Sequence, residues 1–211
     1  MKFILANIGR LRHILPIIGL ASLTVSPVLF MTEPLESQEV PSEIRAVVAK
    51  MNSLTSFRAT VQIGQGNGLA SGQLSYQGGK VHLQMSDGRV VAGNGRSMVV
   101  YSPASRTAGK QPMAGGGGGL GWILSGYEWR VGSGNASGQA INSNATNQEV
   151  RIVWGRDYIL RRLSVKRKDS DSWFTIALSN VRPVGGFPAG LFSYSPPAGS
   201  RTVENPLNER N

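Results

Sequence analysis

The chain has 211 residues and carries 22 lysines and arginines against 12 acidic residues, a formal net charge of +10. Its 27 glycines are nearly twice the usual share of about 7%, and with 11 prolines they favour many turns over long helices. Cysteine is absent and only two histidines occur, which excludes disulfides, thiolate metal sites and a cysteine nucleophile, so the composition favours a β-rich binding protein over an enzyme.

The first 30 residues have the layout of a secretory signal. Lys2, Arg10 and Arg12 precede an uncharged stretch over residues 14–30. As a helix this stretch would measure about 26 Å, slightly less than the ~30 Å hydrocarbon core of a membrane. A cleaved signal is therefore favoured, and a retained membrane anchor is the alternative. In both cases the domain is expected to work outside the cytoplasm.

Export changes what the positive charge implies about partners. Without the three cations of the signal, the chain keeps 19 basic residues against 12 acidic ones. An exported protein with this balance is expected to meet an anionic membrane surface or an acidic partner, and no nucleic acid. The densest basic run is a candidate docking patch for a partner, with a solvated strand and turn as the alternative. It consists of Arg161, Arg162, Lys166, Arg167 and Lys168.

A linker over residues 31–41 leads into one predicted amphipathic helix. Ser42 is expected to cap this helix, and Glu43 in its first turn is favoured by the helix dipole. Apolar residues then recur at helical spacing and form one stripe over about three turns. The stripe consists of Ile44, Val47, Val48, Met51 and Leu54.

Beyond Ser56, apolar and polar residues alternate, which is typical of strands with one buried and one wet face. Turn residues such as Gly78-Gly79 and Asp87-Gly88 separate the first strands. The expected strands cover residues 57–63, 73–77, 80–85, 98–101, 150–154, 158–168 and 173–181.

Three segments have a different character. Five successive glycines at residues 115–119 predict a hinge, and the apolar residues 120–124 after it are expected to form a short lid helix. The polar, glycine-rich residues 132–147 predict a long hairpin loop. Residues 187–199 predict one helical turn and a short strand, and residues 206–211 form a tail.

The sequence contains no recognised catalytic or cofactor-binding pattern. A G-x-S-x-G elbow, a P-loop, an H-E-x-x-H pair and an EF-hand spacing are all missing from it. Residues 64–68 resemble a phosphate loop, but they join two predicted strands, so a hairpin turn is expected. His82 falls on the polar side of its strand and is expected to be an ordinary surface histidine. We therefore expect no catalytic residue, no metal site and no cofactor.

The sequence predicts about ten antiparallel strands that share one apolar face. The two predicted helices are too short to bury all of this face. Such a sheet either closes into a packed barrel or curls around a cavity. We expect an α+β fold that is mainly antiparallel β, and in the second case the N-terminal helix and the lid helix would cover a hydrophobic ligand cavity. Plain core packing is the alternative for any one of the expected wall residues. These are Val47, Met51, Leu54, Phe57, Val61, Leu74, Tyr76, Val81, Leu83, Met98, Val100, Trp122, Leu124, Ile152, Trp154, Phe174, Ile176 and Phe192.

Four motifs occur in order along residues 42–205, which we expect to form a single domain. The amphipathic helix runs into MNSLTSFRATVQ (residues 51–62), and GQLSYQGGKVHLQ (72–84) follows. Residues 95–103 end in Tyr-Ser-Pro, and GLFSYSPPAGSRTV (190–203) is similar to a Phe-x-Phe-x-Pro-Pro-x-Gly strand ending. In these motifs the chain resembles the periplasmic outer-membrane lipoprotein carriers, the LolA-like family.

The resemblance implies an incomplete barrel that holds lipoprotein or lipid acyl chains. It also implies transfer from an inner-membrane lipoprotein exporter to an outer-membrane acceptor. Members often carry a Lys-Arg-Pro-like stretch in the second strand, whose arginine latches the lid, whereas Gln77-Gly78-Gly79 stands here. This departure bears on transfer to a standard acceptor more than on lipid binding. The alternatives are an envelope-anchored lipid- or protein-binding sensor of the same fold, and a structural β-domain with a filled core.

Overall fold

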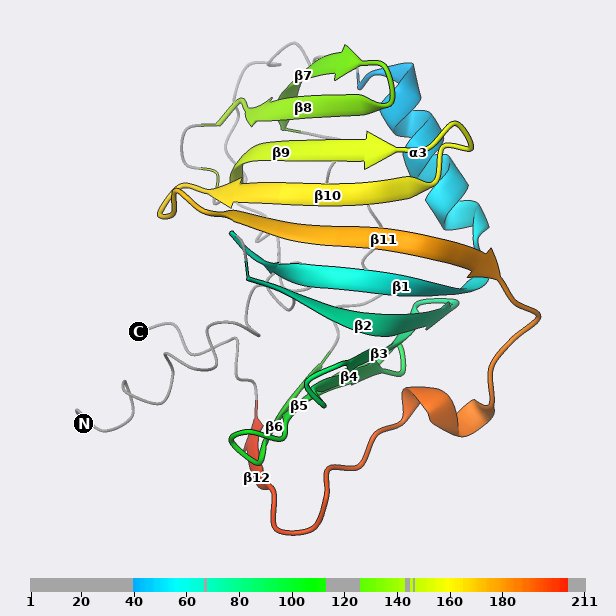
Figure 1. The fold of residues 1–211 in the computed structure, drawn as a ribbon, viewed down its shortest axis with the longest axis vertical. Helices are drawn as coiled ribbons and strands as arrows, with labels where there is room; N and C mark the ends of the chain where they lie inside the picture. Colours follow the sequence, from blue (N-terminus) through cyan, green and yellow to red (C-terminus); the bar gives the residue numbers. More distant parts are fainter. Residues whose placement is uncertain (1–39, 67, 113–125, 143–144, 146, 205–211) are drawn as a thin grey trace, which may run out of the picture.

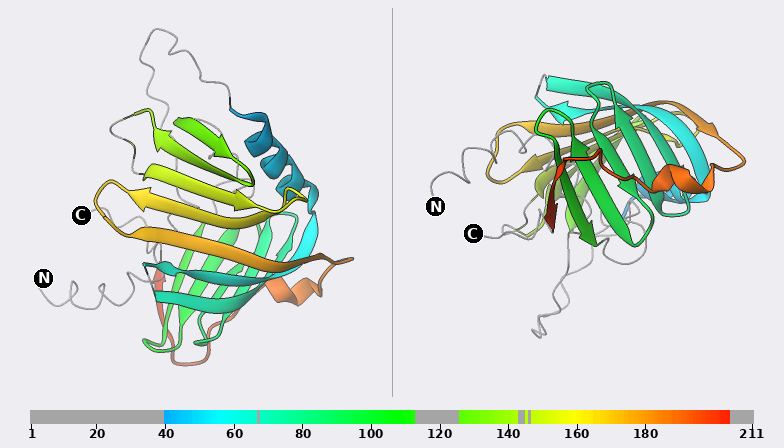
Figure 2. Two further views of the ribbon diagram at one scale, coloured as in Figure 1. Left: turned by 45° about the horizontal axis from the view of Figure 1, so that its top comes forward. Right: turned by 90° about the horizontal axis from the view of Figure 1, so that it is seen from below.

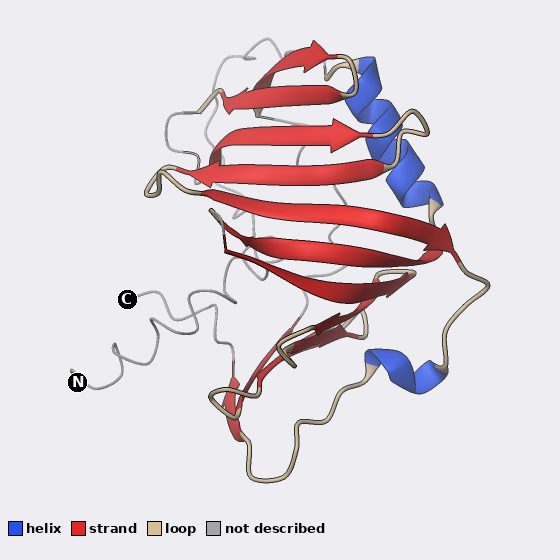
Figure 3. Ribbon diagram, viewed as in Figure 1, coloured by secondary structure: helices blue, strands red, loops and turns tan. Residues whose placement is uncertain are grey.

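The computed structural model describes residues 40–66, 68–112, 126–142, 145 and 147–204. They contain one α-helix, α3 (Ser42–Ser53), and one 3-10 helix, η2 (Ala189–Phe192), with a single curled sheet (Figures 1 and 3). Its strands are β1 (Ser56–Gln65), β2 (Gly68–Gln77), β3 (Lys80–Met85), β4 (Val90–Gly93), β5 (Ser97–Ser102), β6 (Thr107–Pro112), β7 (Tyr127–Gly132), β8 (Asn135–Ala140), β9 (Asn147–Trp154), β10 (Leu160–Arg167), β11 (Trp173–Pro183) and β12 (Arg201–Glu204).

The sheet is an incomplete barrel, as the sequence predicts. Its order is β12-β6-β5-β4-β3-β2-β1-β11-β10-β9-β8-β7, so β12 and β7 are the two edges and the sheet does not close. All neighbouring strands are antiparallel except β12, which pairs with β6 in parallel. The long strands β1 and β11 pair in the middle and join the first and last parts of the domain.

The sheet has two faces, which differ in what covers them. We call inner the face that carries Phe57, Ala59 and Val61 of β1, because these residues belong to one hydrophobic cluster with Ile44 and Val47 of α3. The opposite face is the outer face. Helix α3 lies against the β7–β10 half of the sheet in two views (Figures 1 and 2).

Helix α3 buries the apolar stripe that the sequence predicts, but its start differs from the expectation. Ile44, Val47 and Val48 are buried. The N-cap is Pro41, and no side chain caps the helix. Ser42 is already helical and its Oγ donates to Glu43 Oε2 at 3.0 Å, so the prediction of a Ser42 cap is wrong.

After β11 the chain crosses the outer face and returns to the sheet edge as β12 (Figure 2). We call residues 184–200 the C-terminal strap. Gln77 fixes its start, because the Phe187 backbone N–H donates to Gln77 Oε1 at 3.2 Å. Tyr194 packs against a second hydrophobic cluster, in which its ring lies 5.8 Å from that of Tyr101. The other members of this cluster are Val90, Ala92, Val99 and Ala108.

Several expectations about the connections are wrong. Residues 132–147 are not one long loop, because β8 occupies Asn135–Ala140 and pairs with both β7 and β9. The strand expected directly after η2 is absent from the described tail, and β12 follows later. Strands β4, β6 and β7 were not expected. The predicted signal or anchor, most of the linker, the glycine hinge, the lid helix and the tail lie outside the described residues.

Within the described part of the chain, no helix is long and apolar enough to cross a membrane.

Candidate functional site

The inner face presents continuous cross-strand rows of uncharged residues. Antiparallel pairing places directly opposite residues on the same face, so the register defines each row. One row crosses β1 to β6 through Phe57, Tyr76, Val81, Gly93, Met98 and Gln111. The next row passes through Ala59, Leu74, Leu83, Val91, Val100 and Gly109. On the other side of β1 a row passes through Ile63, Ile176, Leu163, Ile152, Ala136 and Val131.

Most of the predicted wall residues come together in one hydrophobic cluster on this face. Ten of them are buried in it: Val47, Leu54, Phe57, Val61, Leu83, Met98, Val100, Ile152, Trp154 and Phe174. Four more are partly buried and pack against it: Met51, Leu74, Tyr76 and Ile176.

The remaining wall residues lie elsewhere. Val81 is on the inner face, opposite Tyr76, and is half-buried. Phe192 is on the strap, where its ring lies 5.7 Å from that of Phe187. The Arg58 guanidinium lies 5.4 Å from the Phe187 ring, and Arg58 points to the outer face. Phe192 therefore belongs to the cover of the outer face, not to the inner wall. Trp122 and Leu124 lie outside the described residues.

Two shallow hollows lie in the described part of the chain, and α3 lines neither of them. The first is a partly open hollow of about 170 Å³ at the sheet end where β1 turns into β2, which we call the Gln65 end. The second is an open groove of about 410 Å³ along β8 and β9. The first is lined by Ile63, Gly64, Gln65, Gly68, Ala70, Arg89 and Phe174. The second is lined by Asn135, Ala136, Ser137, Glu149, Arg151, Ile152 and Val153. A cavity beneath the helix thus remains a prediction.

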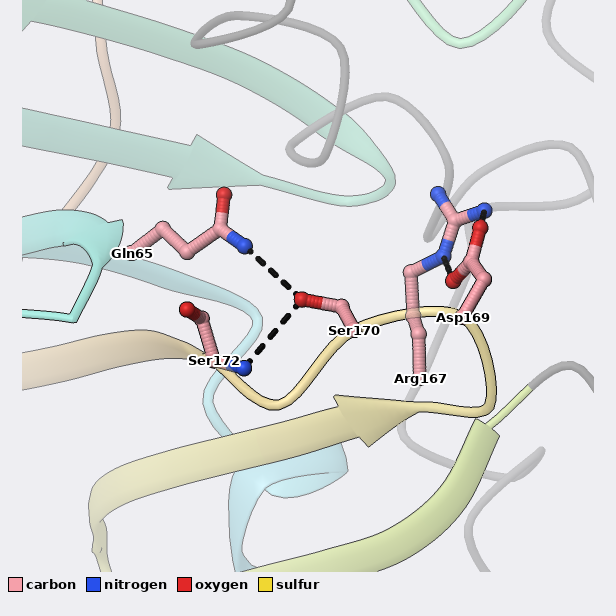
Figure 4. A network of polar contacts seen from close by, with 5 residues as sticks. All are labelled: Gln65, Arg167, Asp169, Ser170 and Ser172. Carbon is pink, nitrogen blue, oxygen red and sulfur yellow. Dashed lines mark hydrogen bonds and ion pairs between the residues drawn. The ribbon is translucent and has the colours of Figure 1, made fainter.

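The Gln65 end is held by polar contacts between two hairpins (Figure 4). Gln65 Nε2 donates to Ser170 Oγ at 3.2 Å, and the Ser172 backbone N–H donates to the same oxygen at 3.2 Å. Arg167 forms two hydrogen bonds with Asp169, at 2.9 and 2.8 Å. These contacts connect the β1–β2 hairpin to the β10–β11 turn through Gln65, which lines the first hollow.

Polar atoms without partners occur among the apolar residues of the inner face. Gln111 is only 7% exposed, and among the described residues its Oε1 has no hydrogen-bond donor and the buried Nε1 of Trp129 has no acceptor. Trp129 lies over Gly138, where a Cβ atom would come within 3.0 Å of its ring. Each unpaired buried polar group destabilises the fold by about 1–3 kcal/mol. These atoms can hydrogen-bond to polar groups of a ligand on this face.

Burial shifts the pKa of some ionisable groups among the described residues. Among the described residues no three His, Asp or Glu side chains come together as a metal site. Burial raises the pKa of Tyr127 on the inner face and lowers the pKa of His82. His82 is half-buried opposite Ser75 and Ala92, on the strand that contacts η2, so it is not an ordinary surface residue.

The predicted docking patch is not a compact cationic surface. Its residues follow β10 and the turn after it over about 23 Å, at ~3.3 Å per residue. Three of them are paired with acids: Arg161 with Asp157 (3.0 Å), Lys166 with Asp171 (3.7 Å) and Arg167 with Asp169 (2.8 Å). Arg162 and Lys168 are exposed. Docking by this patch stays a prediction, and the acids in it were not recognised because hairpin turns bring them back beside the cations.

The chain shares its fold with solved structures at low sequence identity. An uncharacterized conserved protein from Thermus thermophilus superposes with a TM-score of 0.53 at 9% identity, over 77% of this chain and 99% of that one. Weaker similarity is found to lipoprotein LppX from Mycobacterium tuberculosis (TM-score 0.41, 14% identity, 68% and 95% covered). A putative outer membrane lipoprotein-sorting protein domain from Vibrio parahaemolyticus gives 0.35 at 9% identity, with 72% and 94% covered.

Comparison of sequences adds no relative. No family model matches the chain, and no curated protein matches it. The Thermus structure therefore shows the fold alone, and membership of the lipoprotein-carrier family remains a prediction from the motifs.

Proposed function

We propose that this chain is a periplasmic carrier, not an enzyme, that binds acyl chains of lipoproteins or lipids on its inner face. It would move them from the inner towards the outer membrane. The proposal rests on the uncharged inner-face rows, which extend from β6 to β7 across an unclosed sheet. Helix α3 has 12 residues and so measures about 18 Å, whereas twelve strands at ~4.8 Å spacing extend about three times as far. Helix α3 alone therefore does not span the width of this face.

Reversible binding follows from how tightly the face is packed. Leu83 and Val91 are only 3% and 4% exposed, so an acyl chain enters by separating side chains that are in contact. Burial of a 16-carbon chain contributes about 12 kcal/mol at ~0.8 kcal/mol per methylene. The cost of opening the face offsets part of this gain, as a carrier that releases its cargo requires.

A matched pair of variants on β2 tests the proposal. Leu74 is half-buried on the inner face, and its neighbour Gln73 is exposed on the outer face. Leu74→Asp places a charge on the path of the chain, and we expect it to weaken binding of 1-palmitoylglycerol at least tenfold. Gln73→Asp, with the same new charge, is expected to leave the affinity unchanged. Equal affinities of the two folded variants would contradict the proposal.

Mass spectrometry of protein purified from its own envelope separates the competing functions. A carrier is expected to retain lipoprotein or lipid. A single regulatory protein as the bound species would favour the anchored sensor, and protein without any bound species would favour the structural domain. N-terminal sequencing of the same sample determines whether residues 14–30 are retained.

A further inference from the structure

We propose that the hollow at the Gln65 end binds the anionic head of an amphiphile whose chain lies on the inner face, and that Arg89 is the residue that recognises it. This inference rests on the proposed function and adds the chemical class of the ligand. The recognised group is a carboxylate or phosphate attached to an acyl chain.

The hollow is continuous with the inner face. Ile63 and Phe174, which line it, are 6% and 8% exposed members of the inner-face cluster, and Ala70 lies opposite Ile63. Its volume of about 170 Å³ is below the ~300 Å³ at which pockets begin to hold whole drug-sized ligands. It therefore has room for a head group but not for a complete 16-carbon amphiphile, whose chain must continue along the face.

Arg89 is the charged residue among those that line this hollow. It precedes β4, two positions before the inner-face residue Val91, so alternation directs it to the inner side. Its side chain is 17% exposed. A guanidinium removed from water to this extent destabilises the fold unless it is paired and hydrogen-bonded.

The pairing of Arg89 is incomplete. Its Nε donates to Asp87 Oδ2 at 2.6 Å, and its backbone N–H donates to Asp87 Oδ1 at 3.1 Å. A guanidinium has five N–H donors, four of them on its two terminal nitrogens. Within the described residues these two nitrogens have no acceptor. Asp87 is 47% exposed and accepts from Nε and the backbone N–H of Arg89, so it leaves the two terminal nitrogens for another acceptor.

A bound amphiphile fits this arrangement with its head outward. The chain must lie on an uncharged surface, and Ile63, Ala70 and Phe174 provide that surface directly next to the cation. A carboxylate or phosphate accepts two parallel N–H bonds from a guanidinium, and such charge-assisted bonds are about twice as strong as neutral ones. A neutral head of the same size forms weaker bonds and leaves the arginine charge without a second partner.

The test compares two ligands that share a 16-carbon chain, palmitoyl lysophosphatidylglycerol and 1-palmitoylglycerol, titrated below their micelle concentrations. Wild-type protein is expected to bind the anionic ligand at least tenfold more tightly, and Arg89→Gln to reduce this ratio to about one without weakening the neutral ligand. Arg96→Gln, which removes an exposed arginine from the β4–β5 turn, is the matched control and is expected to keep the ratio. Asp87→Asn is expected to increase it several-fold.

Each other outcome overturns the inference. Equal binding of both ligands by wild-type protein would refute anionic recognition while the carrier proposal stands. Binding of neither ligand would refute both. If inorganic phosphate competes with the anionic ligand at equal concentration, the site binds free anions, and recognition of an amphiphile is refuted. If Arg89→Gln fails to fold, Arg89→Lys is used, because lysine keeps the charge but cannot form the two parallel hydrogen bonds. If Arg89→Lys keeps the full affinity ratio between the anionic and the neutral ligand, the role of the guanidinium is contradicted.

Discussion

At the residue scale, the inner face combines apolar surface with polar atoms that have no partner among the described residues. Gln111 is the clearest example, because it is more than nine-tenths buried and pairs across the strands with Met98. A buried amide at this position is a cost that packing alone does not require. An apolar side chain of similar volume in its place would remove this cost.

Replacement of Gln111 by leucine is expected to stabilise the fold. Removing the unsatisfied Oε1 should raise the free energy of unfolding by about 1 kcal/mol, since a similar volume of apolar groups replaces it. Urea denaturation measures this change. A lower free energy of unfolding would show that the amide has a structural partner.

His82 makes stability depend on pH in a defined direction. Burial lowers its pKa below the usual 6.5, so the folded chain favours the neutral imidazole. The stability that neutral His82 contributes is fully present above pH 6.5 and is lost as the pH falls towards the lowered pKa. The unfolding free energy of wild type, relative to that of His82→Gln, is therefore expected to decrease as the pH falls below 6.5. A difference that is constant across this range would contradict the burial of His82 beneath the strap.

At the element scale, the alternation of apolar and polar residues is sufficient to predict a strand that has one solvent-exposed face. Strand β3 was predicted with its observed bounds, Lys80–Met85, because Val81, Leu83 and Met85 alternate with polar residues. Strand β4 was missed because all four residues, Val90–Gly93, are buried, so nothing alternates. The strap covers its outer face, and that cover comes from more than 90 residues away. Strand β8 was missed because small polar residues and glycine are typical of a loop.

The strap explains why Phe192 was assigned to the wrong face. Its neighbours in sequence alternate like a strand, but η2 and the following segment lie on the outer face. Phe192→Ala is expected to lower the free energy of unfolding by about 3–5 kcal/mol, as for other large-to-small core substitutions. At temperatures where the variant stays folded, its affinity for 1-palmitoylglycerol should equal that of wild type. A selective loss of binding would place Phe192 in the ligand site after all.

At the scale of the whole molecule, the fold is a sheet with two different covers. The strap fills the outer face over β4 to β6, and the outer-face cluster it forms with Val90 and Tyr101 is separate from the inner one. The inner-face cluster is the larger of the two, and its described covers include one 12-residue helix. The sequence could reveal the apolar face and the shortage of helix. It could not reveal the strap or the position of Arg89, because both depend on contacts across the sheet.

Methyl NMR of the protein titrated with 1-palmitoylglycerol tests the central claim most directly, because adjacent valines report on opposite faces. Val91 and Val100 lie on the inner face, whereas Val90 and Val99 lie on the outer face. We predict saturable shifts of the Val91 and Val100 methyl signals, with little change at Val90 and Val99. Shifts confined to the outer pair, or the same small shifts at all four, would contradict acyl-chain binding on the inner face.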